Sequence, residues 1–269
     1  SLTWLAAMEA VEFEILTLPE NLWQVWGGMQ TLGIDLIVQP GKERRKKMLL
    51  ADMDSTMIEQ ECIDELAAEA GVGPRVADIT ARAMNGELDF EQALRERVWL
   101  LKGLPLRTIQ KVYQNRITFM PGGEVLVATM RAHKGYAALV SGGFTDFTRP
   151  VAAKLGFDEH RANRLLKANA ALTGQVGNPI LGREAKVTAL NEISTAQNLH
   201  ANDVLAVGDG ANDLDMLKLA GTGVALHAKP IVQDQVSVRV NHGDLTALLY
   251  LQGYSKSEFV IPPNVSTAP

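Results

Sequence analysis

Short apolar runs that end abruptly in polar or glycine-rich segments recur along this chain. The clearest are residues 48–51 before Asp52, residues 136–140 before Ser141, residues 204–207 before Gly208, and residues 222–226 before His227. Uniformly apolar runs of this length are typical of parallel strands buried on both faces. Segments with helical periodicity lie between them, at residues 122–132, 183–199 and 213–219. The alternation predicts an α/β fold with a doubly wound parallel sheet, whose ligands bind at the carboxyl ends of the strands.

A long segment, about residues 59–118, separates the first two apolar runs. It is rich in Ala, Glu, Leu and Arg, shows helical periodicity and contains no convincing strand. Because it is too long for a single crossover helix, we expect an inserted helical cap over the strand ends. Residues 163–174 predict a second, smaller flap in the form of a hairpin.

Residues 1–47 predict a small βαβ segment and a linker. The strands are expected at residues 11–16 and 34–38, the helix at residues 20–32, and the polar run 41–47 is more typical of a solvated linker than of a binding patch. Since a lone βαβ unit leaves its sheet edges open, this segment is expected to be a partial domain or one completed by a partner. The main domain is then expected at residues 48–260, with a flexible tail at 261–269.

Composition and charge narrow the class of protein. The chain has 269 residues, of which 46% are hydrophobic and 21% charged, as in ordinary soluble globular proteins. Its net charge of −5 argues against nucleic acid or an anionic membrane as a partner. The single cysteine, Cys62, excludes an internal disulfide and a cysteine zinc site and suits a reducing compartment. The first residues lack the basic leader of a secretion signal, so a cytoplasmic enzyme is expected.

Two acidic motifs follow different predicted strands. Asp52 and Asp54 form the first, and Asp209 and Asp213 lie in the second, glycine-rich motif. Alone, an Asp-x-Asp pair is more often a structural turn. Two such loops at the same edge of a sheet, however, can build one oxygen-only site for a hard cation, and Mg²⁺ fits best.

Other metal and nucleotide sites do not fit. A calcium loop beginning at Asp209 would place Ala211 and Leu214 where an EF-hand needs an oxygen ligand and a glycine. A dinucleotide fingerprint beginning at Gly221 lacks its third glycine, and no Walker sequence occurs. The five histidines are scattered without ligand spacing. We therefore assign them no chemistry.

Two further features could hold a phosphate. Ser141, Gly142 and Gly143 offer a hydroxyl and uncovered backbone N–H groups at a strand end. Lys186 could supply a fixed cation, because it lies between the glycine segment and the second acidic loop. Taken alone, the first is equally compatible with an ordinary glycine turn, and the second with a surface lysine.

Taken together and in this order, the motifs resemble those of the haloacid-dehalogenase-like phosphatases. The resemblance covers about residues 48–240. In the predicted cap the resemblance is to one family within this superfamily: residues 61–65, 84–86 and 90–98 are similar to those of the phosphoserine phosphatases. The resemblance implies a Rossmann-like core of the haloacid-dehalogenase type. It also implies that residues 1–47 are only part of the regulatory domain that bacterial members often carry.

Asp52 is the expected nucleophile. A hydroxyl nucleophile, from Ser55 or Thr56, needs an adjacent base that this motif does not provide, whereas a carboxylate with a pKa of about 3.9 is already ionised at neutral pH. The resemblance implies an aspartyl-phosphate intermediate and a role for Asp54 as general acid and base. An anion approaching a phosphate is repelled by about 4 kcal/mol per charge pair at 4 Å, so Mg²⁺ and Lys186 are needed as counter-charges.

The remaining roles follow from the resemblance. Mg²⁺ is expected between the carboxylates of Asp52 and Asp209, with the backbone carbonyl of Asp54 as a further ligand and Asp213 as indirect support. For a phosphoserine substrate, the resemblance assigns the residues that would bind its phosphate, ammonium, carboxylate and apolar parts. They are Ser141 and Gly142 for the phosphate oxygens, Glu61 for the ammonium, Arg97 for the carboxylate, and Met84 and Phe90 for the apolar side. Asn212 is expected to orient the substrate or Lys186.

The expected activity is therefore Mg²⁺-dependent hydrolysis of O-phospho-L-serine, the last step of serine biosynthesis. The alternatives are a phosphotransferase or mutase that uses the same intermediate, a phosphatase for another small phosphomonoester, and an inactive sensor of phosphoserine or Mg²⁺. The sequence leaves the oligomeric state open, and a homodimer remains compatible with it.

Overall fold

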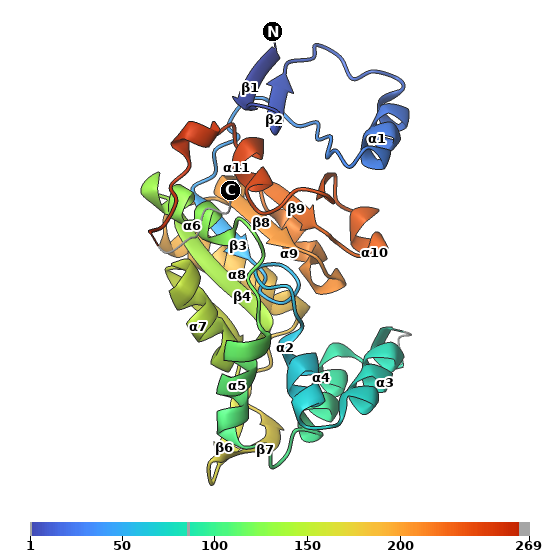
Figure 1. Ribbon diagram of the computed structural model, residues 1–269, viewed down its shortest axis with the longest axis vertical. Coiled ribbons are helices and arrows are strands. Elements are labelled where there is room, and N and C mark those ends of the chain that lie inside the picture. Colours follow the sequence, from blue (N-terminus) through green and yellow to red (C-terminus); the bar gives the residue numbers. More distant parts are fainter. Residues whose placement is uncertain (1, 85–86, 264–269) are drawn as a thin grey trace.

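A six-stranded parallel sheet forms the centre of the computed structural model, which describes residues 2–84 and 87–263 (Figure 1). Its strand order is β10-β9-β8-β3-β4-β5, and every neighbouring pair is parallel. The strands are β3 (Met48–Ala51), β4 (Tyr136–Phe144), β5 (Glu159–Asn163), β8 (Val204–Gly208), β9 (Thr222–Leu226) and β10 (Val238–Val240). The predicted α/β fold with a parallel sheet is confirmed. Strands β5 and β10 had no counterpart in the prediction.

Helices cover both faces of the sheet, as the apolar runs predicted. In β3, Leu49 and Ala51 belong to one hydrophobic cluster and Met48 and Leu50 to another, because successive side chains of a strand point to opposite faces. The first cluster includes side chains from α6 (Gly123–Ala132) and α7 (Thr145–Leu155). The second includes side chains from α8 (Arg183–Ala196) and α9 (Leu214–Leu219). Two shorter helices and three 3₁₀ segments complete this part: α10 (Pro230–Gln233), α11 (Ala247–Leu251), η1 (Ala201–Asp203), η2 (Ala211–Asp213) and η3 (Lys256–Glu258).

The three strands that precede the predicted motifs are neighbours in the sheet, in the order β8, β3, β4. Their carboxyl ends therefore meet at one edge. Strand β4 does not end at Val140, as the sequence suggested, but continues to Phe144 with an irregularity. Val140 pairs with Arg161 and Phe144 pairs with Asn163, so four steps along β4 correspond to two along β5. The extra residues form a bulge at Ser141–Gly143 that turns the backbone out of the regular ladder.

In the described residues, five helices lie between β3 and β4, and the four that precede α6 occupy the segment where an inserted helical cap was predicted. They are α2 (Cys62–Glu69), α3 (Gly73–Met84), α4 (Phe90–Trp99) and α5 (Leu106–Arg116). The two ends of the segment meet where the Glu59 N–H donates to the Thr118 carbonyl at 3.0 Å. The predicted hairpin is also present, as the antiparallel strands β6 (Leu165–Ala168) and β7 (Ala171–Val176). Figure 1 shows the hairpin close to α5, and the N–H of Gly103 donates to the carbonyl of Leu172 in β7 at 2.8 Å.

The predicted N-terminal βαβ segment is wrong in its topology. Strands β1 (Leu2–Ala6) and β2 (Ala10–Phe13) form an antiparallel hairpin, and α1 (Leu22–Thr31) follows it. Residues 34–38 form no strand, because the segment is held by a side chain: the Asp35 carboxylate accepts backbone N–H groups of residues 241, 242 and 243. In Figure 1 the hairpin lies at the opposite end of the molecule from α3 and α5.

The basic run before β3 is tied to the rest of the molecule rather than being a free linker. Arg44 pairs with Glu12 at 2.5 Å, Arg45 with Glu258 at 2.8 Å, and Lys47 with Asp203 at 2.9 Å. In the two described ranges, every helix is too short or too polar to cross a lipid bilayer. The predicted tail falls mostly outside the described residues, at positions 264–269.

Candidate active site

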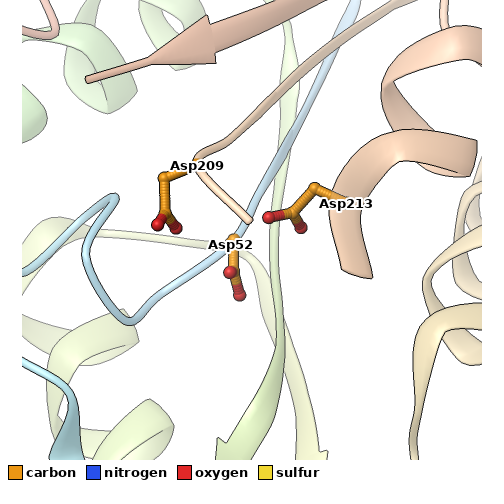
Figure 2. A group of neighbouring side chains, drawn as sticks. All are labelled: Asp52, Asp209 and Asp213. Carbon is orange, nitrogen blue, oxygen red and sulfur yellow. The ribbon is translucent and has the colours of Figure 1, made fainter. Parts of the chain in front are cut away.

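Three buried carboxylates meet at the carboxyl edge of the sheet. Asp52 follows β3, Asp209 follows β8, and Asp213 ends η2 just before α9. Each offers an oxygen, and these oxygens all lie within 4.8 Å of one another. Figure 2 shows the three side chains grouped together, with Asp213 at the end of a helix pointing toward Asp52 and with Asp209 on the other side of Asp52. The two acidic motifs are thus brought together as the sequence predicted.

Lys186 is a buried cation of this cluster. It lies near the start of α8, is almost completely buried, and places Nζ 2.5 Å from Oδ1 of Asp213 and 2.8 Å from Oδ1 of Asp52. The contact with Asp52 is an ion pair whose atoms are poorly aligned for a hydrogen bond. Burial alone would lower the pKa of Lys186, but the charges of Asp213 and Asp52 outweigh it and raise the pKa above its usual value. The two carboxylates therefore stabilise the charged form of the lysine.

The cluster still has an excess of negative charge. Three carboxylates face the buried ammonium of Lys186 and the more distant, exposed ammonium of Lys229, and burial together with the charge of Asp213 raises the pKa of Asp52 well above its ordinary value. The same causes raise the pKa of Asp209 to about 6. Carboxylate oxygens at this spacing are the donor set of a hard divalent cation, whose charge would balance the excess. The residues therefore fit a divalent metal.

Asp54 lies next to this cluster but is held by different partners. Its Oδ1 accepts the backbone N–H of Cys62 at 3.0 Å, and its Oδ2 accepts the Ser141 hydroxyl at 3.3 Å. Burial and the nearby charge of Glu61 raise the pKa of Asp54 to about 6. A carboxyl group with a pKa in this range can both donate and accept a proton near neutral pH.

The β4 bulge places Ser141 and its glycines beside Asp54. The Ser141 hydroxyl accepts the N–H of Gly143 at 2.8 Å, which fixes the side chain. A Cβ atom at Gly143 would lie 2.5 Å from Oδ2 of Asp54, so the backbone could not approach so closely with another residue there. The predicted segment Ser141–Gly143 therefore lies against the acidic motif of β3.

The insertion contributes Glu61 and Arg97 from separate helices. Glu61 precedes α2, and its Oε1 accepts the Ser55 hydroxyl at 2.9 Å. Arg97 is half-buried in the last turn of α4. Its Nε donates to the Ala93 carbonyl at 3.2 Å, and no salt bridge holds its guanidinium within the described part of the chain. Burial lowers the pKa of Arg97, although the negative charges of Asp64 and Glu61 offset this in part.

Phe90 begins α4, and its ring reaches the sheet edge. A Cβ atom at Gly142 would lie 3.3 Å from Phe90 Cζ, so the ring and Gly142 are close neighbours. Met84 ends α3, but its side chain lies outside the described residues. Asn212 lies in η2, where its Oδ1 folds toward Gly210: a Cβ atom there would be 2.4 Å away. Among the described hydrogen bonds, none joins Asn212 to Lys186.

Three neighbours of the site were not predicted. The buried Thr56 hydroxyl donates to Oδ1 of Asp209 at 3.3 Å, which links the first acidic motif to the second. Lys229 places Nζ 3.7 Å from Oδ2 of Asp209 and is largely exposed. Asn163 contacts the backbone of Gly142. Thr56 could have been found from its place beside Asp54, but nothing in the local sequence marks the other two.

Comparison with known proteins identifies the family. The family model for haloacid dehalogenase-like hydrolases matches residues 49–218, which is more than half of the chain. The chain belongs to the haloacid dehalogenase-like hydrolases. In this haloacid dehalogenase-like hydrolase, the matched residues include all of the carboxylates described above together with Lys186.

Several curated relatives of this hydrolase are phosphoserine phosphatases. The enzyme of Methanocaldococcus jannaschii is 42% identical over 208 residues, which cover 77% of this chain and 98% of that protein. The enzyme of Archaeoglobus fulgidus is 40% identical over 221 residues, which cover 81% of this chain but only 64% of that protein. The chain thus spans less than two thirds of the length of some of its relatives.

A solved structure described as a phospho-aspartyl intermediate analogue of phosphoserine phosphatase has a similar fold. It superposes with a TM-score of 0.71 and 41% sequence identity, and the match covers 77% of this chain and 98% of the other. The likeness therefore extends over both the sheet and the inserted helices, since these make up most of the chain from β3 onward.

Proposed function

We propose that this chain is a phosphoserine phosphatase, which hydrolyses O-phospho-L-serine to L-serine and phosphate through a phospho-aspartate on Asp52. The observation that carries the proposal is the position of Asp52 beside Lys186 and two further carboxylates. The charge of Glu61 acts on both Asp209 and Arg97, so these two residues of the insertion belong to the same site. The names of the relatives at 40% identity and above support the same activity. By its product, the reaction belongs to serine biosynthesis.

Asp52 acts as the nucleophile. One carboxylate oxygen attacks phosphorus, the bond from phosphorus to the serine oxygen breaks, and the phosphoryl group passes to Asp52. Lys186 offsets the repulsion between the attacking carboxylate and the phosphate, because its ammonium is fixed 2.8 Å from Oδ1 of Asp52. Asp52, Asp209 and Asp213, with the Asp54 carbonyl, would hold a Mg²⁺ ion, which when bound supplies a Lewis acid for the phosphate oxygens.

Asp54 acts first as the general acid and then as the general base. It protonates the serine oxygen as that oxygen leaves, and it then takes a proton from the water that attacks the phospho-aspartate. Its pKa of about 6, raised mainly by burial, suits both roles near neutral pH. Ser141 and Gly142 bind phosphate oxygens, and Asn212 orients the substrate from the opposite loop.

The inserted helices select the amino-acid end of the substrate. Arg97 has donors without a carboxylate partner among the described residues, and it can hold the substrate carboxylate in a bidentate fork. Glu61 accepts from the substrate ammonium, and Phe90 and Met84 line the apolar side. Residues 59–118 are then the cap of a catalytic domain at 48–260, and residues 1–47 are an accessory segment. The single buried cysteine suits a cytoplasmic location.

Arg97→Ala should separate substrate selection from chemistry. Loss of the bidentate contact with the substrate carboxylate should lower kcat/KM for phosphoserine by about 10²-fold. An aryl phosphate such as p-nitrophenyl phosphate has no carboxylate, so its hydrolysis should change by about threefold or less. Steady-state kinetics with both substrates, measured by phosphate release with Mg²⁺, give the comparison.

The matched control for this experiment is Arg95→Ala. Arg95 lies on the same helix, but it is exposed and pairs with Glu91 at 2.6 Å, so its loss should leave both substrates unaffected. If Arg97→Ala slowed both substrates by the same large factor, Arg97 would not select phosphoserine. If the wild-type chain released phosphate faster from another phosphomonoester, or passed it to an added alcohol, the proposed activity itself would be wrong.

Metal exchange should distinguish Mg²⁺ from other divalent ions. Chelation should stop phosphoserine hydrolysis, Mg²⁺ should restore it, and Ca²⁺ should give about one tenth of that rate or less, because Ca²⁺ prefers more ligands at longer distances. Phosphate release after dialysis against each metal measures the effect. Equal rates with Mg²⁺ and Ca²⁺ would show that the geometry of the ion has no part in the reaction.

A further inference from the structure

Asn163 is buried at the edge of the site, and both polar atoms of its side chain form hydrogen bonds to the backbone. It is the last residue of β5 and is 1% exposed. Its Nδ2 donates to the carbonyl of Gly142 at 2.8 Å and to the carbonyl of Leu181 at 3.1 Å, and its Oδ1 accepts the N–H of Leu181 at 2.7 Å. One carboxamide therefore joins two backbone segments that are 39 positions apart in the sequence.

The first of these segments is the bulge of β4. Between Val140 and Phe144 the register with β5 is broken, so the bulged backbone lacks the regular ladder bonds of a parallel pair. Asn163 is the residue that pairs with Phe144, where the ladder resumes. Its Nδ2 donates a hydrogen bond to the Gly142 carbonyl, in place of the backbone N–H of β5 that would donate in a regular ladder. The orientation of the Gly142 peptide is therefore set by this side chain.

The second segment leads directly into α8. Leu181 precedes Gly182, the residue that caps the helix, and Lys186 is the fourth residue of α8. Both the N–H and the carbonyl of Leu181 are bound to the Asn163 carboxamide, which fixes the peptide planes just before the helix. The start of α8 determines where Lys186 enters the carboxylate cluster.

A third element rests on the same two segments. The Phe90 ring lies against both, since a Cβ atom at Gly142 would be 3.3 Å from Phe90 Cζ and one at Gly182 would be 3.2 Å from Phe90 Cδ1. Gly142 and Gly182, which have no side chains, thus leave room for the ring of Phe90, the first residue of α4. Asn163 sets the distance between the backbones of these two glycine segments. A change in that spacing would be transmitted to the phosphate side and to the cap side together.

We propose that Asn163 is a positioning residue, which holds Gly142 and the Lys186-bearing start of α8 in the geometry that binds the phosphate group of the substrate. It does not touch the substrate itself. Carboxamide geometry is required, because two donors and one acceptor must face three backbone groups at once. The inference rests on the proposed function only in taking Gly142 and Lys186 as the phosphate-binding groups.

Asn163→Leu and Asn163→Ala test the proposal. Leucine keeps the branched shape and adds no charge, whereas alanine removes the side chain, and both leave the three backbone groups without their partner. A shift of about 1 Å in the phosphate-binding groups should lower kcat/KM by roughly 10²-fold for p-nitrophenyl phosphate, and by at least as much for phosphoserine, which also uses the cap side. The inhibition constant of inorganic phosphate should rise about tenfold, since binding of the product uses the same groups.

Two further measurements distinguish positioning from a loss of folding. The Mg²⁺ concentration for half-maximal activity should change by a smaller factor than the phosphate inhibition constant, because Asn163 reaches the carboxylates only indirectly, through Lys186. Ile193→Val serves as the stability control: Ile193 is buried in α8 away from both segments, so it should lower the urea midpoint of unfolding without changing the phosphate inhibition constant.

An unchanged phosphate inhibition constant in both Asn163 variants would overturn the proposal, whether their activity stayed at the wild-type level or fell in proportion to the unfolded fraction. Failure of the proposed function looks different. A wild-type chain that did not hydrolyse phosphoserine would end the phosphoserine assignment, while phosphate inhibition of p-nitrophenyl phosphate hydrolysis would still decide the role of Asn163.

Discussion

Asp52→Asn is expected to lower phosphoserine turnover by roughly 10⁴-fold or more, because the amide keeps the shape of the side chain but is not a nucleophile. The other groups of the site stay in place. Lys186 remains paired with Asp213 at 2.5 Å, so the substitution does not leave its buried charge unpartnered. Rapid-quench experiments with ³²P-labelled phosphoserine should find no label on the variant.

The same substitution should not unfold the protein. It removes one of three neighbouring carboxylates whose mutual repulsion and burial raise the pKa of Asp52, and the urea midpoint should therefore be at or above that of wild type. Asp215→Asn is the matched control, since it replaces an aspartate by asparagine in the same way, but on the exposed face of α9, where Asp215 pairs with Arg183. It should keep full activity. Turnover by a folded Asp52→Asn variant above a trace would remove Asp52 as the nucleophile.

Asp54→Asn is expected to lower phosphoserine turnover by about 10²- to 10⁴-fold, because the amide can neither protonate the serine oxygen nor activate water. Its shape and its acceptor oxygen for the Cys62 N–H can be kept, so the loop should not rearrange. An aryl phosphate makes the test sharper. Nitrophenolate leaves without protonation, so the first step should survive, whereas hydrolysis of the phospho-aspartate should still lack its base.

Asp54→Asn should therefore release a burst of about one nitrophenolate per site from p-nitrophenyl phosphate and then stall. Stopped-flow absorbance measures the burst, and Asp52→Asn provides the comparison, since it should show none. Steady hydrolysis of phosphoserine by Asp54→Asn at the wild-type rate would contradict the acid and base role. A variant with no burst at all would show that Asp54 is needed to form the intermediate, not only to resolve it.

The central strands could be predicted because of where they lie. Residues of β3, β4 and β8 are buried on both faces, and such strands read as continuous apolar runs. Strand β5 could not be found this way. It lies at the edge of the sheet and begins with three polar residues, Glu159-His160-Arg161. Apolar and polar residues therefore do not alternate along it, and nothing in its sequence predicts a strand. Its pairing with β4 depends on the neighbouring strand rather than on its own side chains.

The N-terminal segment shows the opposite error. Residues 34–38 have an apolar pattern that predicts a strand, but Asp35 binds three backbone N–H groups of residues 241–243 and holds the segment outside any sheet. The partner lies more than 200 positions away in the sequence. Propensity describes only what a segment does locally, and a tertiary contact of this kind overrides it.

For the site, the sequence alone determined which strand ends carry chemistry, because parallel strands place their carboxyl ends, and with them Asp52, Ser141 and Asp209, at one edge of the sheet. That the three strands are neighbours, in the order β8, β3, β4, was decided only by the tertiary structure. The tertiary structure alone decided the contacts between them. The pairing of Lys186 with both Asp52 and Asp213, and the three hydrogen bonds of Asn163, depend on the register of β5, the bulge in β4 and the start of α8. These features are set by packing between distant segments, and a difference of one residue in register would move a side chain to the other face of the sheet.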